Sequence, residues 1–408
     1  MLNCSVQIRV MEARFAGIAN LLNDGGGLLR VIKFEVSGLF GREGLIELDF
    51  NSDINIITGR NGSGKTSVLK LLWYIVSGNI LLALKEVEFK KATLVTDLYE
   101  CTVHRLSRST CKVDWIQDGR QRELYDIEDE DGDVVENAED EANGCLRSLG
   151  SSVFLPTFRR IEGGFSISDH LPSPFSRAVR AKNDIEESLV ALSSKLSNKS
   201  HIFVSSLSTV DVVGLLFRQY TELSEKYNSL QQSVSQEVIR KIKDFKSDGF
   251  VNSGEYKLDQ AILALDQIRS QVESMEASRE TIMRPLEAVR ELVMRLFRHS
   301  GIKLGQLSFG EAAGAVNSEM LSAGEKQMLS FIAYNAFYSD SIFIIDEPEL
   351  SLHVDWQRQL FPTLLSQQTS NQFIIATHSP FIYSKYPDKE LQIDVDRGDQ
   401  GDAELGGE

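Results

Sequence analysis

Three short runs rich in apolar residues lie near the two ends of the chain. They are Ile54–Thr58, Ile342–Ile345 and Ile374–Ala376. Runs without regular alternation of apolar and polar side chains are typical of parallel strands buried on both faces. The pattern therefore predicts an α/β fold built on a parallel sheet.

The N-terminal half carries further strand signals. Residues 28–58 alternate enough to predict two or three strands. Within residues 80–125, runs such as Tyr99–His104 and Cys111–Ile116 are typical of half-buried strands. We expect these to form an antiparallel layer on the same core.

The apolar spacing becomes helical from about Asn183 to Ser300. Two apolar stripes are separated by the turn-forming segment Ser247–Gly254, which predicts an antiparallel helical hairpin. Pro285 would kink or restart the helix that follows. The stripes fit a self-packed bundle, and they also fit an arm that carries a dimer interface or a partner's docking site. Their members are Val234, Val238, Ile242 and Phe245 on one helix and Leu258, Ile262, Leu265, Val272 and Met275 on the next.

A glycine-rich segment follows the first apolar run and precedes an amphipathic helix whose expected inward face includes Val68 and Leu72. A strand, a glycine-rich loop and a helix in this order are the context of a phosphate-binding loop. Lys65 would reach the β- and γ-phosphates, and Thr66 would bind Mg²⁺. The sequence therefore predicts binding of ATP with Mg²⁺. The predicted loop consists of Gly59, Arg60, Asn61, Gly62, Ser63, Gly64, Lys65, Thr66 and Ser67.

Two carboxylates follow the run that begins at Ile342. Ligands of parallel sheets bind beyond the carboxyl ends of the strands, so Asp346 is expected to bind Mg²⁺. Glu347 is expected to polarise the attacking water as a general base. An acidic pair after a strand can also open a helix, but its combination with a phosphate loop favours catalysis.

Two further segments have both a structural and a functional interpretation. Ser322 and Glu325, within Leu321–Gln327, have the spacing of a capping box at the start of a helix. A capped helix start also presents N–H groups to an anion. His378 follows the third apolar run, where it would lie on the γ-phosphate side of the sheet. A single histidine after a strand is more often structural than catalytic.

Together these motifs resemble the ATP-binding cassette (ABC) superfamily over roughly residues 28–160 and 302–390. Leu321–Gln327 is similar to its signature motif, Asp346–Glu347 to its Walker B pair, Glu349–His353 to its D-loop and His378 to its switch histidine. The resemblance implies that Ser322 and Gly324 of one subunit complete the ATP site held by Lys65 of another. It thus implies a homodimer or a higher homo-oligomer.

Within this superfamily, the motifs look closest to a branch without transporters. No stretch reaches the roughly eighteen consecutive apolar residues expected of a membrane-spanning helix. The branch includes the SMC and Rad50 ATPases, the overcoming-lysogenization-defect (OLD) nucleases and the ATPase subunits of the antiphage systems PARIS (AriA) and Septu (PtuA). The resemblance implies the ATPase, sensor and scaffold subunit of a bacterial antiphage system that responds to a phage protein.

Departures from these families refine the expectation. Cys4, Cys101, Cys111 and Cys145 are scattered, which does not match the zinc hook of Rad50. About thirty residues follow His378, too few for the Toprim domain of the OLD nucleases. We therefore expect a separately encoded nuclease, of the Toprim type first and the HNH type second.

Two other functions stay open at this point. One is a Rad50-like or SMC-like ATPase of DNA repair or chromosome maintenance that binds DNA directly. The other is an ATP-dependent scaffold without a nuclease. A formal net charge of −16 argues against a chain-wide nucleic-acid surface. The acidic run Tyr125–Glu141 is expected to be a solvated loop or, less simply, a docking patch or nucleic-acid mimic.

The chain has 408 residues and four unpatterned cysteines, which fits a cytoplasmic protein. Residues 1–27 lack a convincing secretory signal. The Q-loop glutamine is not assigned, although the region after Phe154–Arg160 is its expected neighbourhood. The expected regions are an N-terminal arm (1–27), an N-terminal ATPase lobe (28–182), a helical insertion (183–300), a C-terminal ATPase lobe (301–393) and an acidic tail (394–408).

Overall fold

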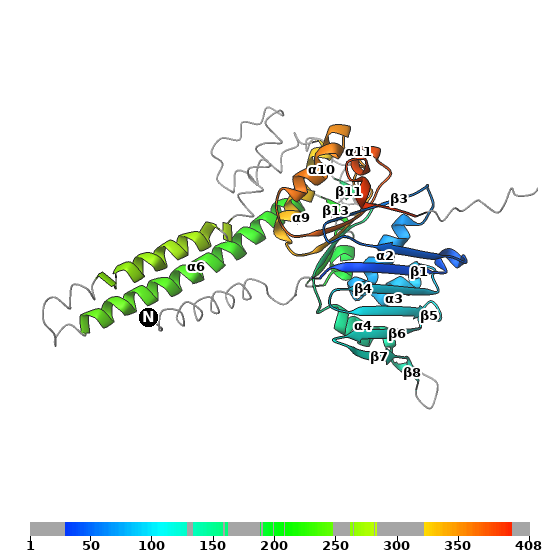
Figure 1. Cartoon of the computed structure of the whole chain (residues 1–408), viewed down its shortest axis with the longest axis horizontal. Helices are drawn as coiled ribbons and strands as arrows, with labels where there is room; N and C mark the ends of the chain where they lie inside the picture. Colours follow the sequence, from blue (N-terminus) through cyan, green and yellow to red (C-terminus); the bar gives the residue numbers. More distant parts are fainter. Residues whose placement is uncertain are drawn as a thin grey trace, which may run out of the picture. The chain divides into compact units, whose positions relative to one another are not determined.

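The chain divides into two compact units, one formed by Met1–Leu207 with Tyr338–Glu408 and the other by Ser208–Phe337 (Figure 1). The computed structural model describes residues 29–128, 134–157, 160–161, 188, 191–198, 200–207, 209–247, 262–263, 265–280, 282–283 and 322–393. The expected N-terminal arm and acidic tail lie outside these residues.

A six-stranded parallel sheet forms the centre of the first unit. Its strand order is β12-β10-β14-β15-β3-β16. Every residue of the four inner strands is buried, as expected of a sheet covered on both faces. The three apolar runs form β3, β14 and β15, so the expected α/β class is confirmed. The strands are β3 (Ile54–Thr58), β10 (Ser152–Leu155), β12 (His201–Phe203), β14 (Ile342–Asp346), β15 (Gln372–Ala376) and β16 (Glu390–Gln392).

An antiparallel sheet of six strands, blue to cyan in Figure 1, forms a second layer with the order β2-β1-β4-β5-β6-β7. The expected antiparallel layer is therefore present. Its strands are β1 (Val31–Ser37), β2 (Leu45–Asp49), β4 (Lys91–Thr96), β5 (Glu100–Arg105), β6 (Cys111–Gln117) and β7 (Arg120–Leu124).

Helix α2 (Lys65–Val76) contacts both sheets, since it touches β4 on one side and β10, β14 and β15 on the other. The sequence predicts an amphipathic helix, but Leu71, Trp73 and Tyr74 are buried as well. The antiparallel sheet covers the face that would otherwise meet solvent. Trp73 stacks on Phe154 of β10 with ring centroids 5.4 Å apart. Losing a buried tryptophan of this kind costs about 3–5 kcal/mol.

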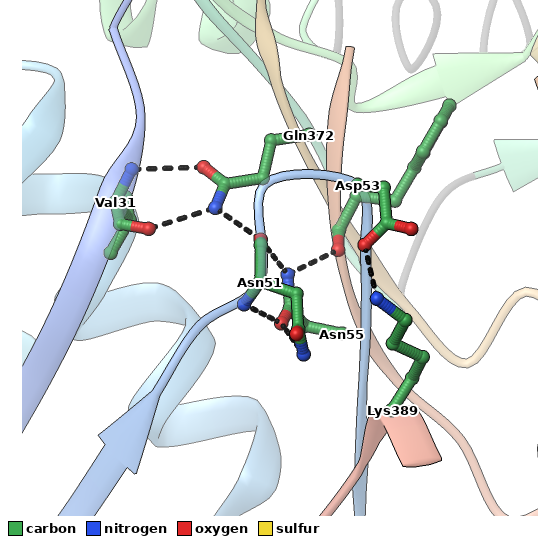
Figure 2. Close-up of polar contacts among 7 residues, drawn as sticks. Val31, Asn51, Asp53, Asn55, Gln372 and Lys389 are labelled. Carbon is green, nitrogen blue, oxygen red and sulfur yellow. Dashed lines mark hydrogen bonds and ion pairs between the residues drawn. The ribbon is translucent and has the colours of Figure 1, made fainter. Parts of the chain in front are cut away.

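A buried polar network joins the two sheets (Figure 2). Gln372, at the start of β15, accepts a hydrogen bond from Val31 N (2.9 Å) and donates one to Val31 O (2.8 Å). It also donates to Asn51 O (2.8 Å). Asn55 accepts from Asn51 N (2.6 Å) and donates to Asn51 O (2.9 Å). Beside this network, Lys389 forms an ion pair with Asp53 at 2.7 Å. The network fixes the amino end of β15, opposite the end that carries the functional residues.

Further described elements of this unit are η1 (Leu39–Gly41), α3 (Ile80–Glu86), β8 (Ile127–Glu128), β9 (Val134–Glu136), α4 (Ala138–Leu146), β11 (Arg160–Ile161), β13 (Ser206–Leu207), α10 (Val354–Leu365), α11 (Pro380–Tyr383) and η4 (Pro387–Lys389). No helix among the described residues is long and apolar enough to cross a membrane.

The described part of the second unit is helical. Helix α6 (Thr209–Ser247) is 39 residues long, and residues 265–280 form a helical segment of the expected hairpin (Figure 1). The Arg279 guanidinium lies 5.8 Å from the ring centroid of Tyr227 on α6. Ile262 and Leu265 remain 50% and 65% exposed, so the hairpin leaves part of its apolar stripe on the surface. Helix α9 (Ala323–Phe337) contacts α6.

One segment differs from the sequence-based expectation of helix from residue 183 onward. Residues His201–Phe203 form β12, which pairs in parallel with β10 at the edge of the central sheet. The buried His201 ring lies 2.8 Å from the Ser152 hydroxyl, Nδ1 to Oγ. Three residues are too few to show a strand pattern, and their conformation depends on the neighbouring edge of β10.

Candidate functional site

The predicted phosphate loop connects β3 to α2. Gly59 has φ 150°, and a Cβ atom built on it would lie 2.4 Å from the Ile393 carbonyl oxygen. Gly64 has φ 98°, and a Cβ atom built on it would lie 3.1 Å from the side chains of Leu39 and Phe40. Both conformations favour glycine, which explains why glycine occupies these two positions of the loop.

The side chain of Lys65 forms hydrogen bonds with the main chain of its own loop. Its Nζ atom donates hydrogen bonds to the carbonyl oxygens of Gly59 (2.9 Å) and Arg60 (3.1 Å). Burial lowers the pKa of Lys65, and three carboxylates at the end of β14 oppose that effect. The Ser63 hydroxyl oxygen is buried and has no hydrogen-bond partner within the described residues. The loop thus holds polar groups suited to phosphate oxygens.

The other residues of the loop differ in exposure. Arg60, Asn61 and Gly62 are exposed, whereas Thr66 and Ser67 lie half-buried in the first turn of α2. Thr66 directly follows Lys65, so it lies at the N-terminus of α2. The backbone N–H groups there would meet an anion.

Asp346 is the last residue of β14 and is fully buried. Its Oδ2 atom accepts a hydrogen bond from the hydroxyl of Thr157, which lies just beyond the end of β10. Strands β10 and β14 are parallel neighbours, so their carboxyl ends meet. Thr157 is not among the residues predicted from the sequence. The one signal was a hydroxyl residue after an apolar strand, inside the segment Phe154–Arg160.

Glu347 has a backbone conformation that is uncommon for a side-chain-bearing residue, with φ 47°. Its N–H donates to the Ala376 carbonyl oxygen at 2.8 Å, which ties it to the end of β15. Burial raises the pKa of Glu347, and nearby Asp346 and Glu349 raise it further. The charges of Lys65 and His378 act in the opposite direction and lower it.

His378 lies on the loop after β15. Its side chain is exposed, and its main-chain N–H donates to Glu349 Oε1 at 2.7 Å. The preceding residue, Thr377, donates its N–H to the Ile57 carbonyl oxygen at 3.2 Å. The structure therefore brings His378 to the same sheet edge as Glu347.

Ser322 and Gly324 belong to the second unit. Ser322 donates its N–H and its hydroxyl to Glu325 Oε2, both at 2.8 Å, and its hydroxyl accepts from Glu325 N at 3.3 Å. The capping box is therefore formed at the start of α9. Leu321 lies outside the described residues, as do the residues 158–159 and 162–187 where a Q-loop would continue.

The arrangement fits a magnesium–nucleotide complex. The carboxylates of Asp346, Glu347 and Glu349 all act electrostatically on the one ammonium group of Lys65, so negative charge is in excess among these four residues. A hard divalent cation bound by carboxylate and hydroxyl oxygens would balance that excess. The Thr66 hydroxyl and the Asp346 carboxylate are oxygen donors of this kind.

Comparison with known proteins assigns the family. Residues 157–384, more than half of the chain, match the family described as "AAA domain, putative AbiEii toxin, Type IV TA system". The chain belongs to this family. The expectation of a nucleotide-binding ATPase is thereby confirmed.

Individual relatives match over very different lengths. The chain is 21% identical over 429 residues to "Retron Vc95 probable ATPase" of Vibrio cholerae serotype O1 biovar El Tor, covering 95% of this chain and 77% of that protein. It is 41% identical over 63 residues to "Endonuclease GajA" of Bacillus cereus (strain VD045), covering 14% of this chain and 11% of GajA. It is 37% identical over 73 residues to "Retron Ec83 probable ATPase" of Escherichia coli, covering 15% of this chain and 14% of that protein.

Solved structures with a similar chain course include the Smc head domain with an extended coiled coil, bound to the C-terminal domain of ScpA, from Pyrococcus furiosus. That match has a TM-score of 0.36 and 13% identity, and it covers 87% of this chain and 91% of that one. The recombination mediator protein RecF gives a TM-score of 0.32 with 11% identity, covering 88% of this chain and 95% of RecF.

Proposed function

We propose that this AAA-domain protein binds ATP with Mg²⁺ on the loop Gly59–Ser67 and hydrolyses it beside Glu347. One observation carries the proposal. Lys65, Asp346, Glu347 and His378 come from three separate segments and meet at the carboxyl ends of β3, β14 and β15. Ligands of parallel sheets bind at such an edge.

Each residue has a distinct part in binding. Backbone N–H groups of the loop and the N-terminus of α2 attract the phosphates. Lys65 exchanges its hydrogen bonds to the Gly59 and Arg60 carbonyls for hydrogen bonds to phosphate oxygens. Thr66 and Asp346 hold the magnesium ion, which supplies charge neutralisation at the transferring phosphate when it is bound.

Two residues act in the hydrolytic step. Glu347 orients the attacking water and accepts its proton, because its main chain is anchored to β15 beside the phosphate loop. From the adjacent loop, His378 donates a hydrogen bond to the γ-phosphoryl group that is transferred to water. Water attacks phosphorus as the bond to ADP breaks, which yields ADP and inorganic phosphate.

The second half of each site comes from another copy of the chain. In this proposal, Ser322 and Gly324 at the start of α9 contact the nucleotide held by Lys65 of a partner. Each chain carries one phosphate loop and one such segment, so two chains enclose two nucleotides. ATP then favours the closed dimer, and hydrolysis reopens it.

The biological role that we propose is the sensor and scaffold ATPase of a bacterial antiphage system, acting in the cytoplasm. Support comes from the resemblance to the PARIS and Septu ATPases and from the similarity to two retron ATPases and to GajA, an endonuclease by name. The chain would hold a separately encoded nuclease, of the Toprim type first and the HNH type second, and respond to a phage protein.

Purification of the Glu347→Gln protein with ATP from its host tests this role. We expect a stoichiometric nuclease and little bulk DNA. Abundant duplex DNA, with ATP hydrolysis strongly stimulated by linear duplexes, would instead favour a Rad50-like or SMC-like DNA ATPase. A bare homo-oligomer would contradict the nuclease partnership and leave the ATPase chemistry untouched.

A further inference from the structure

Glu349 lies two residues beyond the proposed general base, on the tight connection between β14 and α10. The connection is held by its own backbone, since Leu352 N donates to the Glu349 carbonyl oxygen at 3.0 Å and Leu350 N donates to that of Glu347 at 3.3 Å. Ser351 adopts φ 68° within it. The Glu349 side chain therefore projects from a fixed backbone.

The loop that carries His378 is attached at three points. Thr377 N donates to the Ile57 carbonyl oxygen on β3, and the Ser379 hydroxyl donates to Gln357 Oε1 on α10 at 2.6 Å. Between them, His378 N donates to Glu349 Oε1 at 2.7 Å. The main chain of His378 is thus fixed, whereas its side chain remains exposed.

The carboxylate of Glu349 has a second feature that a purely structural contact would not need. Its Oε2 atom is buried and has no hydrogen-bond partner within the described residues. Its charge acts on both Lys65 and Glu347. Leaving a buried charged oxygen without a partner is unfavourable, so a neutral residue would serve better if the loop needed only a tether.

We infer that Glu349 is a positioning residue of the proposed ATP site, which holds His378 by its main-chain N–H and thereby aims the imidazole at the phosphate beside Glu347. This inference rests on the proposed function. Glu349 contacts neither the phosphates nor the reacting water in this account. Through its hydrogen bond to His378 N, Glu349 joins the connection that follows β14 to the loop that follows β15.

A double-mutant cycle tests the inference on the full chain. The variants are Glu349→Ala, His378→Ala, the double variant and Glu349→Gln, which keeps an acceptor oxygen and removes the charge. Glu43→Ala, which removes an exposed carboxylate distant in sequence from both loops, is the matched control. Steady-state ATP hydrolysis gives kcat and KM, and thermal unfolding checks that each variant is folded.

We expect Glu349→Ala to lower kcat about tenfold or more, because His378 would no longer be held in position, with KM changed less than about threefold. Glu349→Gln should retain more of the kcat than Glu349→Ala. The double variant should be no slower than His378→Ala alone, because residues that act through one another are not additive.

Several results would overturn the inference. They are a wild-type kcat in folded Glu349→Ala, a wild-type kcat in His378→Ala, or additive losses in the double variant. Failure of the proposed function looks different. In that case the wild-type protein would show no ATP hydrolysis, or hydrolysis that persists in Lys65→Ala. This comparison is made before any Glu349 variant is tested.

Discussion

The Thr157 hydroxyl donates a hydrogen bond to the carboxylate of Asp346, across 189 positions of the chain. This contact joins the ends of β10 and β14 and fixes one oxygen of the expected magnesium ligand. We therefore expect the loss of this contact to weaken the binding of Mg²⁺ by Asp346.

Thr157→Val removes this hydrogen bond and preserves the shape of the side chain. A hydrogen bond to a charged group is worth about 1.5–3 kcal/mol, so we expect the Mg²⁺ concentration for half-maximal ATP hydrolysis to rise about tenfold or more. Magnesium titrations of ATPase activity measure it. Thr157→Ser keeps the hydroxyl and should behave as wild type; equal Mg²⁺ requirements in all three proteins would contradict the account.

Ser322→Arg places a large cation where the partner's nucleotide is expected. Hydrolysis should fall to background, while binding of a fluorescent ATP analogue at Lys65 persists. The variant Ser322→Asp distinguishes loss of the helix cap from crowding by a large side chain, because aspartate also caps helices.

Mixing Ser322→Arg with Lys65→Ala makes the test specific for sites shared between chains. A mixed dimer has one site with an intact Lys65 and an intact Ser322, so activity should reappear on mixing. If two inactive proteins remain inactive together although they associate, the shared site is wrong.

Gln372→Met keeps the length of the side chain and removes three hydrogen bonds of the network in Figure 2. Buried backbone groups left without partners cost about 1–3 kcal/mol each. We expect denaturant unfolding to show a loss of at least about 2 kcal/mol. The same substitution at the exposed Gln121 on β7 should change stability by less than about 0.5 kcal/mol.

His201 gives a pH dependence of stability. Burial lowers the pKa of its imidazole from 6.5 to about 4. Below pH 6.5 the unfolded chain binds a proton that the folded chain does not, so stability falls as the pH drops from about 6.5 toward 4. We expect His201 to account for about 2 kcal/mol of the loss between pH 7.5 and pH 5.

The comparison that isolates this effect is His201→Gln, whose stability should depend less on pH over the same interval. His353→Gln, at an exposed histidine, is the control and should retain the wild-type dependence. Parallel pH profiles for wild type and His201→Gln would rule out the assignment.

Sequence patterns were informative where local chemistry decides the structure. The strands β3, β14 and β15 were predictable because strands buried on both faces are rich in apolar residues without regular alternation. The loop Gly59–Ser67 was predictable because its backbone conformations favour glycine. The capping box of Ser322 was likewise visible as a spacing.

Features that depend on distant parts of the chain were not predictable. Thr157 reaches Asp346 only because β10 lies next to β14 in the sheet. The outer face of α2 is buried only because the antiparallel sheet covers it. Glu349 looked like one residue of a D-loop, and its bond to His378 N appears only when two loops separated by 29 positions meet.

The central claim is that Lys65 binds ATP and Glu347 hydrolyses it in a closed pair of chains. Sedimentation of Glu347→Gln with and without MgATP, with bound nucleotide quantified, tests it most directly. We predict that ATP remains unhydrolysed and shifts the protein to a larger species, and that Lys65→Ala with Glu347→Gln binds no ATP and does not shift. Turnover at the wild-type rate in Glu347→Gln, or ATP bound equally well without Lys65, would contradict the account.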